Sequence, residues 1–150
     1  NKDLMLDWDW EKNNAEDLNP NFLTCGSNTI VHWKGHNCGH EWQTSIKNRS
    51  KGEGCPVCSG RKIVEGINDF GSKYPNLLKD WDYSKNTTIS PFSIYRYSIK
   101  RVWWKCHVCG HEWQTSVFKR SRGYGCPCCS RKVAVKGVND FETLYPVLAK

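Results

Sequence analysis

Long hydrophobic runs are absent from this sequence. No apolar stretch approaches the roughly 20 residues that a membrane-spanning helix needs. The first residues also lack the basic-then-apolar pattern of a secretory signal. We therefore expect a soluble protein of a reducing intracellular compartment, in the cytoplasm or the nucleus.

Acidic residues are scarce where basic residues gather. Residues 100–136 carry nine lysines and arginines against one glutamate, whereas residues 1–20 carry two lysines against six acids. The net charge of +7 is therefore unevenly placed along the chain. The basic stretches coincide with the cysteine-rich stretches, which favours a partner of negative charge for those parts.

Cysteine, in contrast, is abundant, with nine residues in 150. An odd number does not suit a complete disulfide framework. Four of the nine form the Cys-x2-Cys pairs Cys106/Cys109 and Cys126/Cys129, separated by 16 residues. This spacing is typical of a tetrahedral zinc site, and we interpret the cysteines as zinc ligands.

The cysteine framework occurs twice, 71 positions apart. Cys38–Ser45 recurs as Cys109–Ser116, and Gly54–Ser59 recurs with one change as Gly125–Ser130. A unit of about 70 residues buries a core that gives only marginal stability, and a bound metal commonly adds the stability that is missing. The repeat predicts two modules with one Zn²⁺ each.

The fold class that we expect is small α+β, stabilised by metal. Residues 30–33 and 102–104 are rich in strand formers, and residues 41–46 alternate as a second strand. Residues 48–54 should turn, and the Cys-Pro-x-Cys pairs at Cys55 and Cys126 suit a helix start. Knuckle, β-hairpin and short helix make tandem treble-clef or zinc-ribbon modules.

Short helical linkers should separate these modules. Asn68 and Asn139 are candidate N-caps, and Pro75 and Pro146 should end the helices that begin there. We divide the chain into the end of a linker unit (1–20), zinc module 1 (21–66), a helical linker (67–90), zinc module 2 (91–137) and the start of another linker unit (138–150). This order suggests a fragment of a longer array.

The ligand set is complete in module 2 and incomplete in module 1. Cys106, Cys109, Cys126 and Cys129 supply a closed thiolate shell. In module 1, Gly35 stands in place of Cys106, which leaves Cys38, Cys55 and Cys58. We expect His36 to be the fourth ligand, slightly ahead of His40. A weakened or empty site is the next alternative, and Cys25 is a more remote one. Cys128 is interpreted as a small buried side chain and Cys25 as a spare thiol.

The tryptophans also recur in matched positions. Trp8, Trp33 and Trp42 correspond to Trp81, Trp104 and Trp113. Rings at such positions are either stacking platforms for bases or the core of a small domain, and we favour the core. Trp10 and Trp103, whose counterparts are not tryptophan, are freer to be exposed.

The motifs resemble a known family, the tandem "probable zinc-ribbon" repeats of treble-clef fingers. The residues that carry the resemblance are Trp103-Trp104-Lys105-Cys106, Gly110-His111-Glu112-Trp113, Arg120 and Gly125-Cys126-Pro127-Cys128-Cys129. The resemblance implies zinc binding and an inferred nucleic-acid-binding role, sometimes beside a nuclease domain in the same protein. In some members the histidine of the Gly-His-x-Trp motif is a ligand, which implies that role for His40.

We expect a zinc-dependent module that binds nucleic acid, DNA in preference to RNA, as the targeting part of a larger protein. Basic side chains that flank the metal-binding turns would contact phosphates. These are Arg49, Lys51, Arg61, Lys62, Lys119, Arg120, Arg122, Arg131 and Lys132.

The sequence also bears on two other classes of function, protein interaction and catalysis. The alternative is a protein-interaction module whose surface is the aromatic linkers around Trp8-Asp9-Trp10 and Trp81-Asp82-Tyr83. Catalysis is not expected, because a closed thiolate shell has no open position for substrate or water. Any cleavage would come from a nuclease domain outside this sequence.

Overall fold

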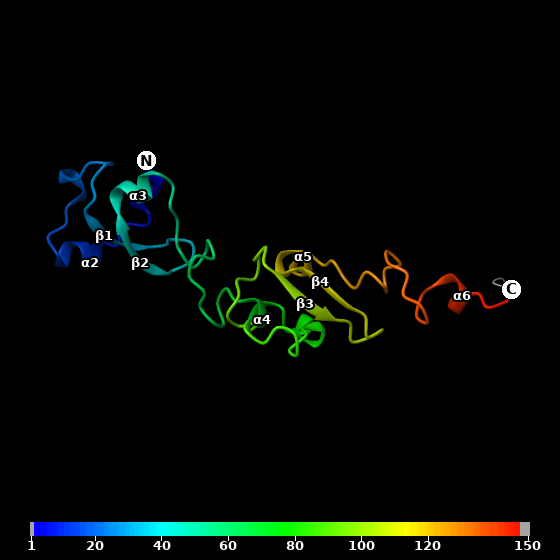
Figure 1. Ribbon diagram of the computed structural model, residues 1–150. Helices are drawn as coiled ribbons and strands as arrows, with labels where there is room; N and C mark the ends of the chain where they lie inside the picture. The colour runs from blue at the N-terminus through cyan, green and yellow to red at the C-terminus, as the bar shows by residue number, and fades with distance from the viewer. Residues whose placement is uncertain (1, 148–150) are drawn as a thin grey trace. The chain divides into compact units, whose positions relative to one another are not determined.

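The computed structural model describes residues 2–147. The chain forms two compact units, Asn1–Lys62 and Ile63–Lys150. Each unit contains one two-stranded antiparallel sheet with short helices around it (Figure 1). The two units are built on the same plan.

Unit 1 is organised around the hairpin of β1 (Ile30–Lys34) and β2 (Glu41–Ser45). Its other elements are α1 (Lys2–Met5), α2 (Trp10–Ala15), the 3-10 helix η1 (Pro20–Phe22) and α3 (Ile46–Ser50). Alternate residues of β1 face inward, so that Val31 and Trp33 are buried. Trp33 pairs directly with Trp42 across the hairpin.

Unit 2 repeats this hairpin with β3 (Arg101–Lys105) and β4 (Glu112–Ser116), in which Trp104 pairs with Trp113. The remaining elements are α4 (Phe70–Lys73), the 3-10 helix η2 (Pro75–Asp80), α5 (Val117–Ser121) and α6 (Phe141–Leu144). The predicted α+β class with two small hairpins is confirmed.

The position of the helix within each module was predicted wrongly. A helix follows the second strand at once, because the Ser45 and Ser116 hydroxyls accept hydrogen bonds from the backbone N–H groups of Asn48 and Lys119. The second strand therefore ends at Ser45, not Ile46. The Cys-Pro-x-Cys segments form hydrogen-bonded turns in which Ser59 N donates to Cys55 O at 3.0 Å.

The caps of the linker helices also differ from the prediction by one residue. Asp69 and Asp140 cap α4 and α6 with their carboxylates. Asn68 and Asn139 instead accept from the backbone N–H groups of residues 64 and 135, at 2.7 and 2.6 Å. The predicted break at Pro75 is confirmed, since α4 ends before it and η2 begins there. Likewise, α6 ends at Leu144, two residues before Pro146.

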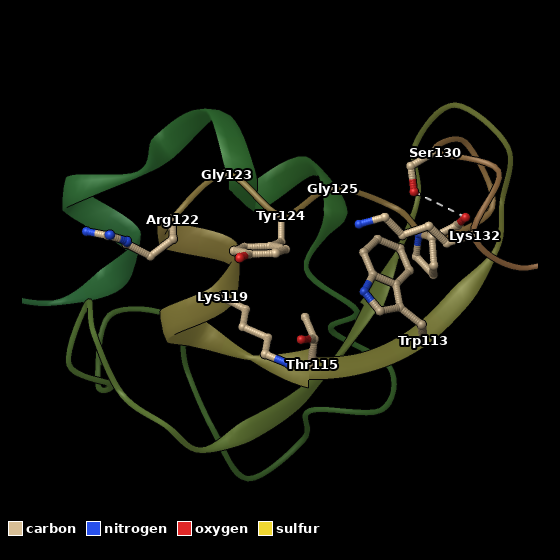
Figure 2. Close-up of a pocket in the computed structure, with 10 residues that line it drawn as sticks. Trp113, Thr115, Lys119, Arg122, Gly123, Tyr124, Gly125, Ser130 and Lys132 are labelled. Carbon is tan, nitrogen blue, oxygen red and sulfur yellow. Dashed lines mark hydrogen bonds between the residues drawn. The ribbon is translucent and has the colours of Figure 1, made fainter.

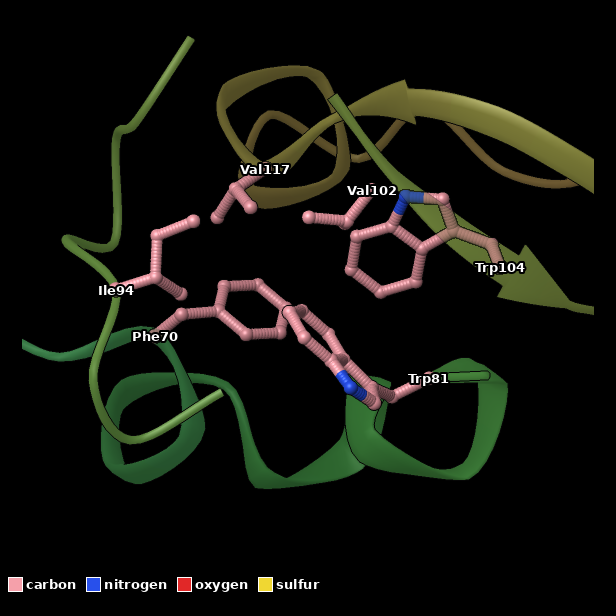
Figure 3. Packing of buried hydrophobic residues seen from close by; sticks show 6 residues of the cluster. All are labelled: Phe70, Trp81, Ile94, Val102, Trp104 and Val117. Carbon is pink, nitrogen blue, oxygen red and sulfur yellow. The ribbon is translucent and has the colours of Figure 1, made fainter. Parts of the chain in front are cut away.

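The segments expected as linkers supply the core of each unit. In unit 2 the cluster consists of Phe70, Trp81, Ile94, Val102, Trp104 and Val117 (Figure 3). The Trp81 and Trp104 rings meet edge to face with centroids 5.3 Å apart. In unit 1, Trp8 and Trp33 meet in the same way at 5.6 Å. Trp8, Trp33, Trp81 and Trp104 are therefore core residues, as predicted, whereas Trp42 and Trp113 are partly buried and pack against the same clusters.

A buried asparagine joins each such segment to the edge of the hairpin. Asn86 accepts from Trp103 N at 2.9 Å and donates to Trp103 O at 2.8 Å, as a paired strand residue would. Asn13 makes the same two bonds to the backbone of His32. Because buried polar groups require hydrogen-bond partners, these bonds fix the position of each asparagine's segment along the first strand of its hairpin, β1 or β3.

Candidate metal centres and the groove beside them

Four thiols converge in unit 2. The sulfurs of Cys106, Cys109, Cys126 and Cys129 all lie within 4.8 Å of one another. Cys106 Sγ is 3.7 Å from Cys129 Sγ, and Cys109 Sγ is 3.6 Å from Cys126 Sγ. Zinc–sulfur bonds of about 2.3 Å in a tetrahedron place the sulfurs about 3.8 Å apart. The donor set therefore fits one Zn²⁺, with all four predicted ligands.

Unit 1 brings together Cys38, His40, Cys55 and Cys58. His40 Nδ1 lies 3.5 Å from Cys55 Sγ and 3.8 Å from Cys58 Sγ. Ordinary zinc–nitrogen and zinc–sulfur bonds predict a separation of about 3.6 Å between such ligands. The second Zn²⁺ site therefore has three thiolates and one imidazole, as the family resemblance implied.

The preference for His36 as the fourth ligand was wrong. His36 Nδ1 lies 2.6 Å from Asp7 Oδ1, and the His36 backbone N–H donates to the same oxygen at 2.9 Å. Its counterpart His107 makes both contacts with Asp80. Cys25 is exposed and does not belong to the four-ligand cluster.

Gly35 explains why the two ligand sets differ. The knuckle backbone is the same in both units, with a 2.9 Å hydrogen bond from Gly35 N to His40 O and from Cys106 N to His111 O. A β-carbon at position 35 would lie 2.4 Å from Cys38 Sγ. Glycine therefore leaves room for the Cys38 sulfur and moves the fourth ligand to His40. His111 instead stacks on Trp113.

The thiols of each cluster interact strongly. Burial and the neighbouring thiols raise the pKa of Cys58 to about 12. A hydrogen bond from the His111 backbone lowers the pKa of Cys109 to about 7, whereas burial raises the pKa of Cys126. The three thiolates of unit 1 and the four of unit 2 repel one another within each site, and a divalent cation removes that cost. Cys128 lies in the buried cluster beside Cys106 and Cys126, as expected for a fifth thiol outside the ligand set.

Two of the predicted phosphate contacts are buried, and we correct their assignment. Arg49 and Arg120 are 7% and 4% exposed. Arg120 Nη2 lies 2.6 Å from Asp80 Oδ2, and Nη1 donates to Tyr124 O at 2.8 Å. Arg49 makes the same contacts with Asp7 and the backbone of Glu53. These guanidinium groups brace the loop that precedes the metal-binding turn.

The other predicted basic residues are exposed. They are Lys51, Arg61, Lys62, Lys119, Arg122, Arg131 and Lys132. In unit 1, Arg61 pairs with Glu53 at 3.2 Å and donates to Gly54 O at 2.7 Å. The basic side chains therefore do not all serve one surface.

Three of the predicted cations line a single groove of about 550 Å³ in unit 2. They are Lys119, Arg122 and Lys132, and Trp113 and Tyr124 line the same groove. Figure 2 shows the Tyr124 ring between Arg122 on one side and Trp113 with Lys132 on the other, with Lys119 below it. Pro127 and Ser130, from the metal-binding turn, complete part of the wall. The metal centre and the groove therefore share one turn.

Sequence reasoning missed Asp7, Asp80 and Tyr124. The two aspartates recur before Trp8 and Trp81, at an offset of 73 residues, and this repeat was the available signal. Tyr124 carries no such signal, because its counterpart is Glu53. The aromatic linker surface is also smaller than expected, since Trp8 and Trp81 are buried while Trp10 and Tyr83 are exposed.

Two knuckle-and-hairpin units with four-ligand zinc sites define tandem treble-clef zinc fingers. The family model described as "Probable Treble clef zinc finger domain" matches residues 4–61 and 77–132, and the chain belongs to this family. Both matched ranges include the segment that carries Trp8 or Trp81, in keeping with its place in the core.

The chain is also similar to an uncharacterized protein of Acanthamoeba polyphaga mimivirus. The two are 26% identical over 149 residues, which cover 90% of this chain and 35% of the viral protein. The chain thus spans about a third of the length of that relative. Within residues 2–147, the helices are too short and too polar for any of them to cross a membrane.

Proposed function

We propose that this chain is a zinc-dependent module that binds nucleic acid, with DNA as the preferred form, and that it targets a larger protein to its substrate. The observation that carries the proposal is the groove of unit 2. Lys119, Arg122 and Lys132 line it, and among its described lining residues none is acidic. Phosphate contacts by such cations supply affinity that does not depend on base sequence.

Zinc would act in this function as a structural ion. It would hold the Cys126–Ser130 turn, from which Pro127 and Ser130 line the groove and which Lys132 follows. Arg120 holds the opposite wall by its bond to the Tyr124 carbonyl. Cations held on rigid elements lose little conformational entropy when they bind a phosphate.

We propose binding without catalysis. Each zinc site has four protein ligands, so that the tetrahedral shell has no position for substrate or water. Any chemistry on the bound nucleic acid would then belong to another domain.

The test is charge reversal in the groove. The triple variant Lys119→Glu, Arg122→Glu and Lys132→Glu should lose most of its affinity for a labelled DNA in a fluorescence anisotropy titration. The slope of log K against log salt should also fall by about 0.7–0.9 for each phosphate contact removed. A matched control reverses Lys73, Lys79 and Lys136, which are exposed and lie outside the groove.

The control variant has the same net charge as the groove variant but should bind far better. If both triple variants bind equally, the groove is not the binding surface. If the zinc-loaded chain binds no nucleic acid at low salt, the proposed function itself is refuted.

A further inference from the structure

The groove of unit 2 contains an exposed ring as well as cations. Tyr124 is 57% exposed, although its backbone is held on both sides. Its N–H donates to Lys119 O at 3.1 Å, and its carbonyl accepts from Arg120 Nη1 at 2.8 Å. The ring is thus presented to solvent from a fixed backbone, a form suited to stacking against a flat partner.

Three cations share the groove with this ring. Lys132 Nζ is 5.9 Å from the Tyr124 ring centroid, and Lys119 and Arg122 line the same groove. Arg122 Cζ is in turn 6.0 Å from the ring of Phe118, which is 42% exposed. The Phe118 and Tyr97 rings meet at 6.4 Å. Two of the cations therefore each lie near an exposed ring, Lys132 near Tyr124 and Arg122 near Phe118.

Unit 1 has the same hairpin, knuckle and serine-capped helix but not this surface. Its counterparts of Tyr124, Phe118 and Tyr97 are Glu53, Lys47 and Gly26. Asn48 stands in place of Lys119, and Glu53 pairs with Arg61. The fold alone therefore does not require these three aromatic side chains, since unit 1 folds without them.

We propose that unit 2 binds a single-stranded nucleic acid, with one base stacked on the Tyr124 ring and with Lys119, Arg122 and Lys132 on the adjoining phosphates. This inference rests on the proposed function. Phosphate contacts alone would serve a duplex equally well, but the bases of a duplex are already stacked on one another. An exposed ring between cations adds affinity only where a base is free to stack on it.

The experiment compares strands and variants at one salt concentration. The zinc-loaded full chain is titrated into labelled single-stranded DNA of about 12 nucleotides, single-stranded RNA of the same sequence, and the DNA duplex. Either single strand should bind more tightly than the duplex. Tyr124→Ala should weaken single-strand binding about tenfold, Tyr124→Phe should retain it, and the salt slope should not change.

Tyr83→Ala is the matched control, because Tyr83 is 59% exposed and lies outside the groove. Equal binding of duplex and single strand, or unchanged affinity in Tyr124→Ala, overturns the stacking proposal. If the triple groove reversal still abolishes binding in that case, nucleic-acid binding stands and only its single-stranded form is refuted. If no probe binds the unmodified chain, both proposals fail.

Discussion

Arg120 Nη2 lies 2.6 Å from Asp80 Oδ2, and this contact joins α5 to the end of η2, while Arg120 Nη1 donates to Tyr124 O in the loop before the metal-binding turn. Both side chains are nearly inaccessible, at 4% and 9% exposure. The Arg120 guanidinium also lies 5.0 Å from the Trp104 ring centroid. A segment outside the hairpin therefore supports the position of the zinc turn.

Asp80→Asn should destabilise unit 2 strongly. Removing one partner leaves the Arg120 charge buried without compensation, which typically costs about 3–5 kcal/mol. Urea unfolding of the zinc-loaded chain, followed by tryptophan fluorescence, measures this cost. Glu53→Gln breaks the exposed pair with Arg61 and should cost below about 1 kcal/mol. Equal and small losses in both variants would refute the supporting role of Asp80.

The zinc content of histidine variants tests the ligand set of unit 1. His40→Ala should lower bound zinc from two ions per chain to about one, because His40 belongs to the cluster of four donors. His36→Ala and His111→Ala should retain both ions, since His36 binds Asp7 and His111 stacks on Trp113. Native mass spectrometry gives the count. Full retention in His40→Ala would contradict the assignment.

The role of Gly35 predicts a rescue of that loss. Adding Gly35→Cys to His40→Ala should restore the second zinc ion, because the knuckle of unit 2 holds Cys106 and Cys109 on the same backbone. Cys38 would shift from the space that a β-carbon at position 35 fills. Gly35→Ala with His40→Ala is the control, which adds the carbon without a sulfur and should stay at one ion. No difference between the two double variants would show that the knuckles are not interchangeable.

The sequence predicted the metal chemistry better than the roles of the charged side chains. The Cys-x2-Cys pairs fix the ligands of unit 2, because thiol spacing is a local property. The choice between His36 and His40 depends on which ring faces the sulfurs and on Asp7, which lies 29 residues before His36. A long-range partner of that kind cannot be found from spacing alone.

Arg49 and Arg120 show the corresponding limit for charge. Both arginines lie in basic stretches of the sequence, and for that reason they were predicted to contact phosphate. The sequence does not show that both side chains are buried. The repeat did contain a signal. Each module that contains one of these arginines is preceded by an Asp-Trp pair, at Asp7 and again at Asp80. The helix position was missed for a local reason, because the Ser45 and Ser116 caps lie within segments that alternate like strands.

Substitutions of Glu53, the counterpart of Tyr124, test whether unit 1 lacks the nucleic-acid surface of unit 2. Glu53→Gln removes one carboxylate and releases Arg61, so it should raise affinity for single-stranded DNA a few-fold through charge alone. Glu53→Tyr removes the same charge and adds the ring that unit 2 carries. It should bind more tightly than Glu53→Gln, at an unchanged salt slope. Equal affinities of the two variants in an anisotropy titration would show that a ring at this position makes no contact.

Metal removal tests most directly the claim that zinc organises both units. The amide NMR spectrum of the chain should collapse for β1, β2, β3 and β4 when a chelator removes zinc, and it should return after two equivalents of Zn²⁺ are added. Retention of the dispersed hairpin signals in the metal-free chain would contradict the account.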